Sequence, residues 1–248
     1  IIETRVMIRK SDGWIFADYV WNEDQTEAYL DLNSSVKNVS WRDENNVIRN
    51  VEYRNPNEAQ CIVCHKTKSY INGVYNQINI PIGIKPQNLN KTYTYGSETV
   101  NQLTKWINLG ILENNFNLPS EENTIVNYND INNSLEKRVR SYFDINCAHC
   151  HKEKGHCDYR PLRLSFSDTG SSNGLTNMGV CVPTQDMQDF DPELDKLITP
   201  RRTDKSMLFH RVNTTNEAFR MPLHGRTLIH TEGVAIIEEW INSLDDCR

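Results

Sequence analysis

The chain has 248 residues and a formal net charge of −6 at pH 7. That length is enough for one large domain or for two to three small ones. The acidic balance and the lack of a lysine or arginine run argue against a nucleic-acid or anionic-membrane surface, and no apolar run approaches the length of a transmembrane helix.

Residues 1–54 have the pattern of antiparallel strands. Side chains alternate in character over residues 4–9, and Ser11-Asp12-Gly13 predicts a hairpin turn into a second strand. Polar turns over 22–24 and 43–46 separate further β-rich runs. We therefore expect a small antiparallel sheet that packs against the rest of the chain.

A helix start follows, with Asn55 as the predicted cap and Pro56 as the first helical residue. This helix runs into Cys61-Ile62-Val63-Cys64-His65. Cys-x-x-Cys-His is the attachment signature of c-type haem, in which two thiols bond to the porphyrin vinyl groups and the histidine binds iron. Cys61 and Cys64 are thus predicted to hold a haem, with His65 as its proximal ligand.

The segment after this motif is predicted to be a loop over residues 73–90, because it is rich in Gly, Pro and Asn. Ser97-Glu98 then predicts a helix start, and Gly110 its end. The apolar residues on one face of this helix are Val100, Leu103, Trp106 and Ile107.

Ser134 is predicted to cap a third helix, which runs into a second copy of the motif, Cys147-Ala148-His149-Cys150-His151. It predicts a second covalent haem on Cys147 and Cys150, with His151 as the proximal ligand. The alternatives are a Cys₄ zinc site and a thioredoxin-like redox pair. Zinc chemistry gives no reason for a histidine directly after both pairs, and the redox pair needs a βαβ context.

A long irregular stretch follows the second motif. A short helix is predicted over residues 206–212, and Thr231 is predicted to cap a last helix. The apolar face of that last helix carries Val234, Ile237, Trp240, Ile241 and Leu244. Each half of the chain therefore has a capped helix that ends in the motif and a later helix that contains Trp-Ile-Asn.

This order resembles a class I cytochrome c domain, whose first and last helices cross beside the haem. The resemblance covers residues 55 to about 115 and residues 133–248. It implies a mainly α fold with two class I cytochrome c-like helical domains, 55–118 and 119–248, the second with a loop insert. The small antiparallel β-rich segment 1–54 precedes them.

The whole chain also resembles a poorly characterised family of exported bacterial dihaem c-type cytochromes. Covalent haem attachment takes place outside the cytoplasm in bacteria, so we expect a periplasmic or extracellular protein whose export signal or lipoprotein leader has been removed. The segments that carry the resemblance are Glu3-Thr4-Arg5, Tyr19-Val20-Trp21-Asn22, the loop 81–90, the second motif with Asn146, Gly179-Val180-Cys181 and Arg220-Met221-Pro222.

Met221 is the expected sixth ligand of the second haem. It lies just before the final helix, in a Met-Pro sequence that resembles the axial-ligand loop of class I domains, and a thioether raises the potential relative to a second imidazole. Met207 has the pattern of buried helix packing, and Met178 and Met187 lie in the loop-rich insert. A second imidazole from His210 or His224 is the alternative ligand.

The first haem has no comparable partner, because no Met occurs between His65 and Met178. Three explanations stay open: an iron that is five-coordinate or binds water, an unusual ligand from the loop 82–95, and a ligand from outside the domain, for which Met7 is the candidate. The candidates in the loop are Lys85, Lys91, Tyr93 and Tyr95.

The remaining histidines and cysteines have weaker assignments. His149 is expected to face away from iron, and His156, His210, His224 and His230 are expected to be solvated or to cap helices. Each proximal histidine is expected to donate to a backbone carbonyl, near Pro81 for the first haem and near Pro161 for the second. A disulfide between Cys157 and Cys181 would stabilise the folded protein by about 3 kcal/mol through loop closure. Cys247 is able to pair with either of these cysteines instead.

The leading interpretation is a dihaem c-type cytochrome, an electron carrier rather than an enzyme, that relays single electrons between redox partners such as a dehydrogenase or another cytochrome. One alternative is a dihaem peroxidase or oxidase with an open first haem. That enzyme needs a distal acid or base, and Glu98 is the first carboxylate after His65. The other alternative is a cytochrome subunit of a larger dehydrogenase or haem-wire assembly, with residues 1–54 as a docking module.

Overall fold

The computed structural model describes residues 1–43 and 45–247. Helices and strands each make up 24% of the protein, and the strands form several small antiparallel sheets. The predicted mainly α fold with two class I cytochrome c-like helical domains is therefore wrong. The main physical reason lies in residues 66–101, where the chain forms tight hairpins.

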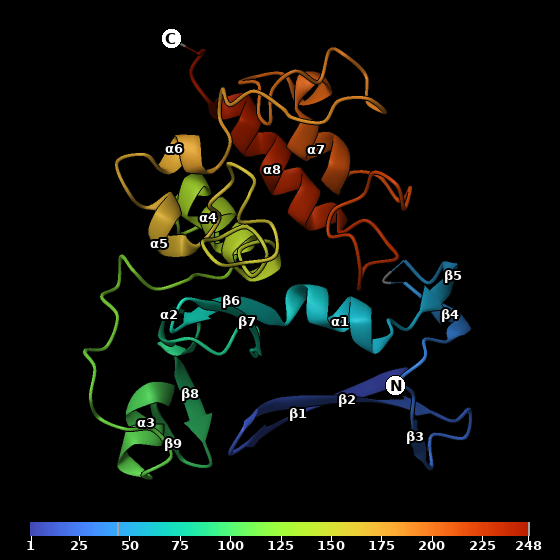
Figure 1. The fold of residues 1–248 in the computed structure, drawn as a ribbon, viewed down its shortest axis with the longest axis vertical. Helices are drawn as coiled ribbons and strands as arrows, with labels where there is room; N and C mark the ends of the chain where they lie inside the picture. The colour runs from blue at the N-terminus through green and yellow to red at the C-terminus, as the bar shows by residue number, and fades with distance from the viewer. Residues whose placement is uncertain (44, 248) are drawn as a thin grey trace.

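Strands come first along the chain, short helices and hairpins follow over residues 58–108, and the elements described between residues 135 and 247 are helices (Figure 1). The described strands are β1 (Glu3–Lys10), β2 (Gly13–Trp21), β3 (Ala28–Leu30), β4 (Val36–Arg42), β5 (Ile48–Arg54), β6 (Lys66–Ile71), β7 (Val74–Asn79), β8 (Thr92–Tyr95) and β9 (Glu98–Asn101). The described helices are α1 (Glu58–Cys64), α2 (Pro86–Leu89), α3 (Gln102–Asn108), α4 (Leu135–Asn146), α5 (Phe166–Thr169), α6 (Gly174–Asn177), the 3₁₀ turn η1 (Thr203–Lys205), α7 (Met207–Val212) and α8 (Thr231–Ser243).

The strands predicted in residues 1–54 are present. β1 and β2 pair along their length around the predicted Ser11-Asp12 turn, which places Met7 opposite Phe16. β3 joins them on the other edge of β2, and β4 pairs with β5 in a separate hairpin. The polar turn predicted over 43–46 connects β4 to β5, and Glu44 within it lies outside the described residues.

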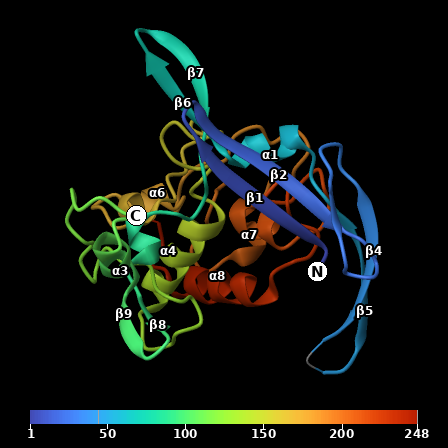
Figure 2. The same cartoon turned by 90° about the horizontal axis from the view of Figure 1, so that it is seen from below.

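Two hairpins replace the loop and the helix start predicted after the first motif. Asn72 and Gly73, with φ of 52° and 77°, form the turn between β6 and β7, a turn that needs positive φ at both positions and favours Asn-Gly. Gly96, with φ of 65°, turns the chain between β8 and β9, so Ser97 and Glu98 do not begin a helix. The β6–β7 hairpin stands out from the rest of the molecule in Figure 2.

Helix α3 begins later than predicted, at an Asn101 cap whose side chain accepts from the backbone N–H groups of Leu103 and Thr104 at 2.9 and 3.3 Å. It packs against β9 and α2 and lies well apart from α1 (Figure 1). The first half of the chain therefore lacks the helix crossing expected of a class I domain.

The main apolar core lies between α4 and α8, two of the helices predicted for the second half. Ser134 caps α4 by accepting from the Lys137 N–H at 3.3 Å, as predicted. The rings of Phe143 and Trp240 meet edge to face across the helix pair, with centroids 5.9 Å apart. The most deeply buried core residues are Val139, Phe143, Met178, Ile198, Ile237 and Ile241.

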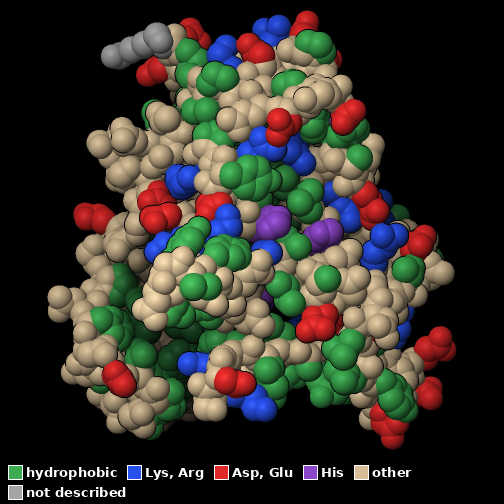
Figure 3. All heavy atoms as spheres, viewed as in Figure 1, with side chains coloured by type: hydrophobic (Ala, Val, Ile, Leu, Met, Phe, Trp, Pro, Cys, Tyr) green, Lys and Arg blue, Asp and Glu red, His purple; other side chains and the backbone are tan. Residues whose placement is uncertain are grey.

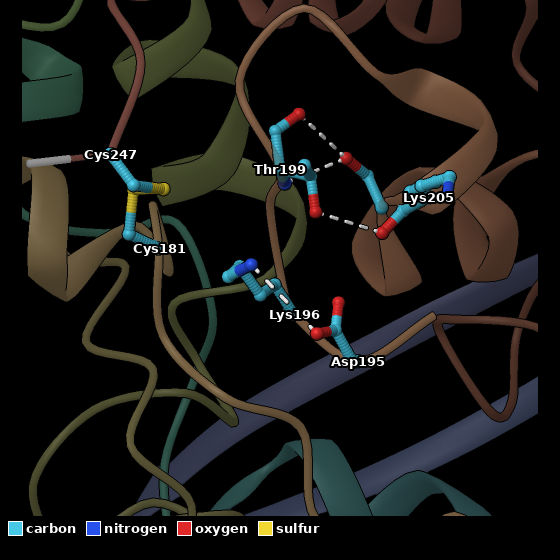
Figure 4. Close-up of a disulfide and its surroundings, with 7 residues drawn as sticks. Cys181, Asp195, Lys196, Thr199, Lys205 and Cys247 are labelled. Atoms are coloured by element: carbon cyan, nitrogen blue, oxygen red, sulfur yellow. Dashed lines mark hydrogen bonds and ion pairs between the residues drawn. A yellow bond between two sulfur atoms is a disulfide. The ribbon is translucent and has the colours of Figure 1, made fainter. Parts of the chain in front are cut away.

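The insert between α4 and α8 is largely irregular and is tied to the C-terminal tail by a disulfide. Figure 4 shows this bond, which joins Cys181 to Cys247. The sequence left three pairings open, and Cys181–Cys247 is the one formed. Cys157 is a buried free thiol. Over residues 1–43 and 45–247, none of the helices has both the length and the apolar character that crossing a membrane requires.

Candidate cofactor site

Helix α1 presents the first motif. Its start is fixed by a capping box in which Asn57 accepts from the Gln60 N–H at 2.9 Å and the Gln60 side chain accepts from the Asn57 N–H at 3.1 Å. Asn57 is therefore the cap, two residues later than predicted. The helix ends at Cys64, and His65 follows with its N–H bonded to the Cys61 carbonyl at 3.0 Å.

Helix α4 presents the second motif at its C-terminal end. Cys147 follows the last helical residue, and its N–H bonds to the Phe143 carbonyl at 2.8 Å. The chain then makes one more turn, closed by the His151 N–H and the Cys147 carbonyl at 3.0 Å. The packed α4–α8 core thus holds Cys147, Cys150 and His151 on a rigid support.

A cavity of about 350 Å³ is lined by these three residues and by Met221. Met221 precedes Pro222 through a cis peptide bond and lies in the loop between α7 and α8, before the final helix as predicted. These four residues therefore line a single space. Its lining also includes Cys64, Cys157, His149, His156, His224 and Met207. The apolar walls include Leu162, Leu164, Leu197, Met207 and Leu208.

The imidazole of His151 is partly buried and neutral. Burial lowers the pKa of His151 to about 4, so the ring is neutral at pH 7. Its Nδ1 atom is buried and has no hydrogen-bond partner among the described residues. The carbonyl partner predicted near Pro161 is therefore not formed, although Pro161 does line the cavity.

The two motifs meet at the edge of this cavity. Cys64 and Cys150 place their sulfur atoms 3.9 Å apart, and both thiols line the cavity. The hydrogen bond from Cys150 lowers the pKa of the Cys64 thiol and raises that of Cys150. His149, which was expected to face away, also lines the cavity, and its ring nitrogen lies within 4.8 Å of both sulfur atoms.

The first-motif histidine lies against the N-terminal sheet. His65 Nδ1 is 3.2 Å from the carbonyl oxygen of Ile80, the residue before Pro81, which confirms the carbonyl partner predicted there. The Phe16 ring of β2 packs on the imidazole, with centroids 4.8 Å apart. Burial lowers the pKa of His65, so this ring is also held neutral.

The candidates for a ligand from the N-terminal half have different surroundings. Met7 is 38% exposed and shares a sheet face with Phe16, because directly opposed residues of antiparallel strands point the same way. Lys85 is engaged in an ion pair with Asp144 of α4, and the side chain of Tyr93 is exposed. Of these three, Met7 is the one on the face that packs against His65.

The remaining histidines fall into two groups. His156 and His224 line the cavity, which keeps His224 as an alternative to Met221. His210 packs between aromatic rings, and His230 is hydrogen bonded to the hydroxyls of Tyr128 and Tyr142 at 3.2 and 3.0 Å. Histidine side chains reach the surface near the middle of the face drawn in Figure 3, between the two halves of the molecule.

Sequence reasoning missed the contact between the halves that brings the motifs together. The backbone N–H of Lys68 in β6 donates to the Lys154 carbonyl at 2.9 Å. The ammonium group of the same lysine forms an ion pair with Asp158. Both partners follow the second motif in sequence. Local sequence patterns do not predict this contact, because neither the strand edge nor the charged residues differ from those that face solvent in other proteins.

No known protein-family model, no curated protein and no solved structure matches this chain. Function is therefore inferred from the two motifs and from the cavity that they share.

Proposed function

We propose that the protein is a dihaem c-type cytochrome that relays single electrons between redox partners outside the cytoplasm. The observation that carries the proposal is the cavity that Cys147, Cys150, His151 and Met221 all line. Those residue types are the two thioether donors and the two axial ligands of a His/Met c-type haem. The neutral ring of His151 agrees with this use, whereas its Nδ1 lacks the carbonyl acceptor expected of a proximal histidine.

The chain supplies attachment, ligation and exclusion of water. Each haem, when bound, supplies an iron that takes up and releases one electron. Cys147 and Cys150 would hold the second haem, and His151 and Met221 would bind its iron. Buried leucines form part of the cavity wall, and a low dielectric would disfavour the more highly charged oxidised form.

The first motif contributes a second attachment point directly beside the second one. Cys61 and Cys64 would hold the first haem, and His65 would be its proximal ligand. Because the Cys64 and Cys150 sulfur atoms are 3.9 Å apart, both groups would be bonded to neighbouring atoms of the protein. This proximity supports a relay within one chain.

A metal site is the second candidate, favoured by the cluster of Cys64, His149 and Cys150 donor atoms within 4.8 Å of one another. Such a cluster has the sulfur and nitrogen ligands that zinc prefers. It uses neither Cys61 nor Cys147, so it differs from the Cys₄ site weighed from the sequence. The cluster leaves the cavity lined by His151 and Met221 without a role.

Export is part of the proposal. The Cys181–Cys247 disulfide agrees with an oxidising compartment, where structural disulfides persist. The expected partners are other redox proteins outside the cytoplasm.

Covalent haem attachment is the direct test. The protein is produced in a bacterium that exports it and attaches haem, and its mass and haem content are measured after denaturation. We expect two covalent haems, one lost in Cys61→Ala/Cys64→Ala and one in Cys147→Ala/Cys150→Ala, while Cys157→Ala keeps both. A haem-free protein that retains stoichiometric zinc, and loses it in His149→Ala, would instead establish the metal site.

A further inference from the structure

A second cavity, of about 290 Å³, adjoins the cofactor cavity. Its walls come from residues 52–60, around β5 and the start of α1, and from residues 217–227 of the loop between α7 and α8. Leu223 and His224 line both cavities. The loop that carries Met221 therefore separates a largely apolar space from a charged one, and in Figure 1 it extends toward β5.

Two arginines line this pocket, Arg220 buried and Arg226 half-buried, and each has a buried donor without a partner among the described residues. Arg220 is 9% exposed, its terminal nitrogen bonds to Glu217 at 3.1 Å, and its Nε is buried without a partner among the described residues. Arg226 donates to the carbonyls of Val212 and Thr214, and its Nε is likewise buried and unpartnered in the part of the chain described. Buried donors of this kind call for an acceptor.

The charges in the pocket also call for an anion. Arg54, Arg220 and Arg226 line it, against the carboxylates of Glu52 and Glu217. Arg54 pairs with Glu217 at 3.5 Å, so this carboxylate is shared between two arginines. Burial, and then the neighbouring charge of Arg220, lower the pKa of Arg226. One further carboxylate would balance the three guanidinium groups, whose planar forks match its two oxygens.

We propose that this arginine pocket binds a carboxylate, supplied by a propionate of the porphyrin held in the adjoining cavity. This inference rests on the proposed function. The shared Leu223 and His224, and the position of Arg220 directly before Met221, bring the two sites together. Because Arg54 and Gln60 belong to the N-terminal half, the pocket would also give that half a role at the second haem. A free organic acid is the other source of the same chemistry.

The test measures the midpoint potential of the second haem against pH in the holoprotein. Arg220→Gln and Arg226→Gln each remove a positive charge, so we expect a lower potential at alkaline pH and a propionate ionisation step that moves to higher pH. Arg220→Lys keeps the charge and should restore most of the potential. Arg202→Gln, which removes an exposed arginine paired with Asp204 outside the pocket, should match the wild type.

A titration with succinate separates the two sources of the carboxylate. With a propionate in the pocket, calorimetry should detect no saturable succinate binding to the wild type. Saturable binding that is lost in Arg220→Gln, with unchanged potentials, would assign the pocket to a free acid and overturn the propionate. Unchanged potentials without succinate binding would overturn the carboxylate pocket altogether. A protein without covalent haem would reject the proposed function, and succinate binding alone would then decide whether the pocket takes a carboxylate.

Discussion

Lys85 forms an ion pair with Asp144, whose side chain is completely buried. Asp144 also accepts from the Phe166 N–H at 2.8 Å, so its carboxylate joins α4 to α5 as well as to the N-terminal half. The pair thus connects the segment after the first motif to the helix that carries the second.

Removing Lys85 should destabilise the protein, because it leaves a buried carboxylate without its counter-charge. We expect Lys85→Ala to lower the free energy of unfolding by about 2 kcal/mol, below the full value for a buried pair because Lys85 is itself partly exposed. Lys205→Ala, which breaks a more exposed pair with Glu193, should cost less than about 1 kcal/mol. Denaturant unfolding measures both, and equal losses would contradict a special role for the Lys85 pair. An altered haem spectrum in Lys85→Ala would instead favour Lys85 as a ligand.

Asp18 should make the protein less stable as the pH rises from 4 to 6. It is 7% exposed, and burial, followed by the nearby Glu3, raises its pKa from 3.8 to about 6. Because the folded-state pKa lies above the unfolded-state value, its favourable contribution is complete below pH 4 and is lost as the pH passes through 6. Asp18→Asn should therefore be more stable than the wild type at pH 7, by about 2 kcal/mol.

The difference between the two proteins isolates Asp18 from the other carboxylates. Unfolding curves of wild type and Asp18→Asn should converge below pH 4 and separate between pH 4 and 6. A constant difference across this range would show that Asp18 does not titrate with the raised pKa.

Met221 should determine the spectrum of the second haem. We expect the ferric protein to show the near-infrared charge-transfer band of His/Met ligation, and Met221→Ala to lose the band and lower the potential of that haem. Met207→Leu is the matched control, because Met207 lines the same cavity from α7 and should leave the band in place. If the band persisted in Met221→Ala, another residue would be the ligand, and His224→Ala would be the next variant to examine.

The Cys181–Cys247 disulfide should contribute about 4 kcal/mol to stability, because it closes a loop with a sequence separation of 66. We expect Cys247→Ser to lose this amount in denaturant unfolding, while under reducing conditions wild type and variant should unfold alike. Cys157→Ser should leave the bridge intact. Thiol labelling of the unfolded, unreduced protein should find Cys157 reactive in the wild type, and its protection would contradict the pairing.

The parts of the fold that local signals determine were predictable. Ser134 and the apolar face of α4 gave that helix, and the Ser11-Asp12-Gly13 turn gave the first hairpin. The Asn72-Gly73 dipeptide is an equally strong signal for β6–β7, although the Gly- and Asn-rich composition around it predicts a loop. The dipeptide is the better guide, because a two-residue hairpin turn needs positive φ at both positions.

The packing of distant segments against one another could not be predicted from local sequence patterns. The Trp-Ile-Asn sequence occurs in both α3 and α8, but α3 has only seven residues and packs on its own hairpin, whereas α8 has thirteen and crosses α4. The approach of Cys64 to Cys150 and the choice of Cys247 as the partner of Cys181 depend on how distant segments pack. Residue spacing along the chain carries no information about either.

The contact between Cys64 and Cys150 also constrains the order in which the protein matures. In the folded chain each sulfur blocks one side of the other, so an enzyme that bonds haem to either motif has least access once the halves have docked. Attachment at both motifs would then have to precede docking, while the chain is still open. Biogenesis of the proposed cytochrome would therefore proceed from two separately loaded halves to a closed molecule, and a chain that closed too early would be trapped without its cofactors.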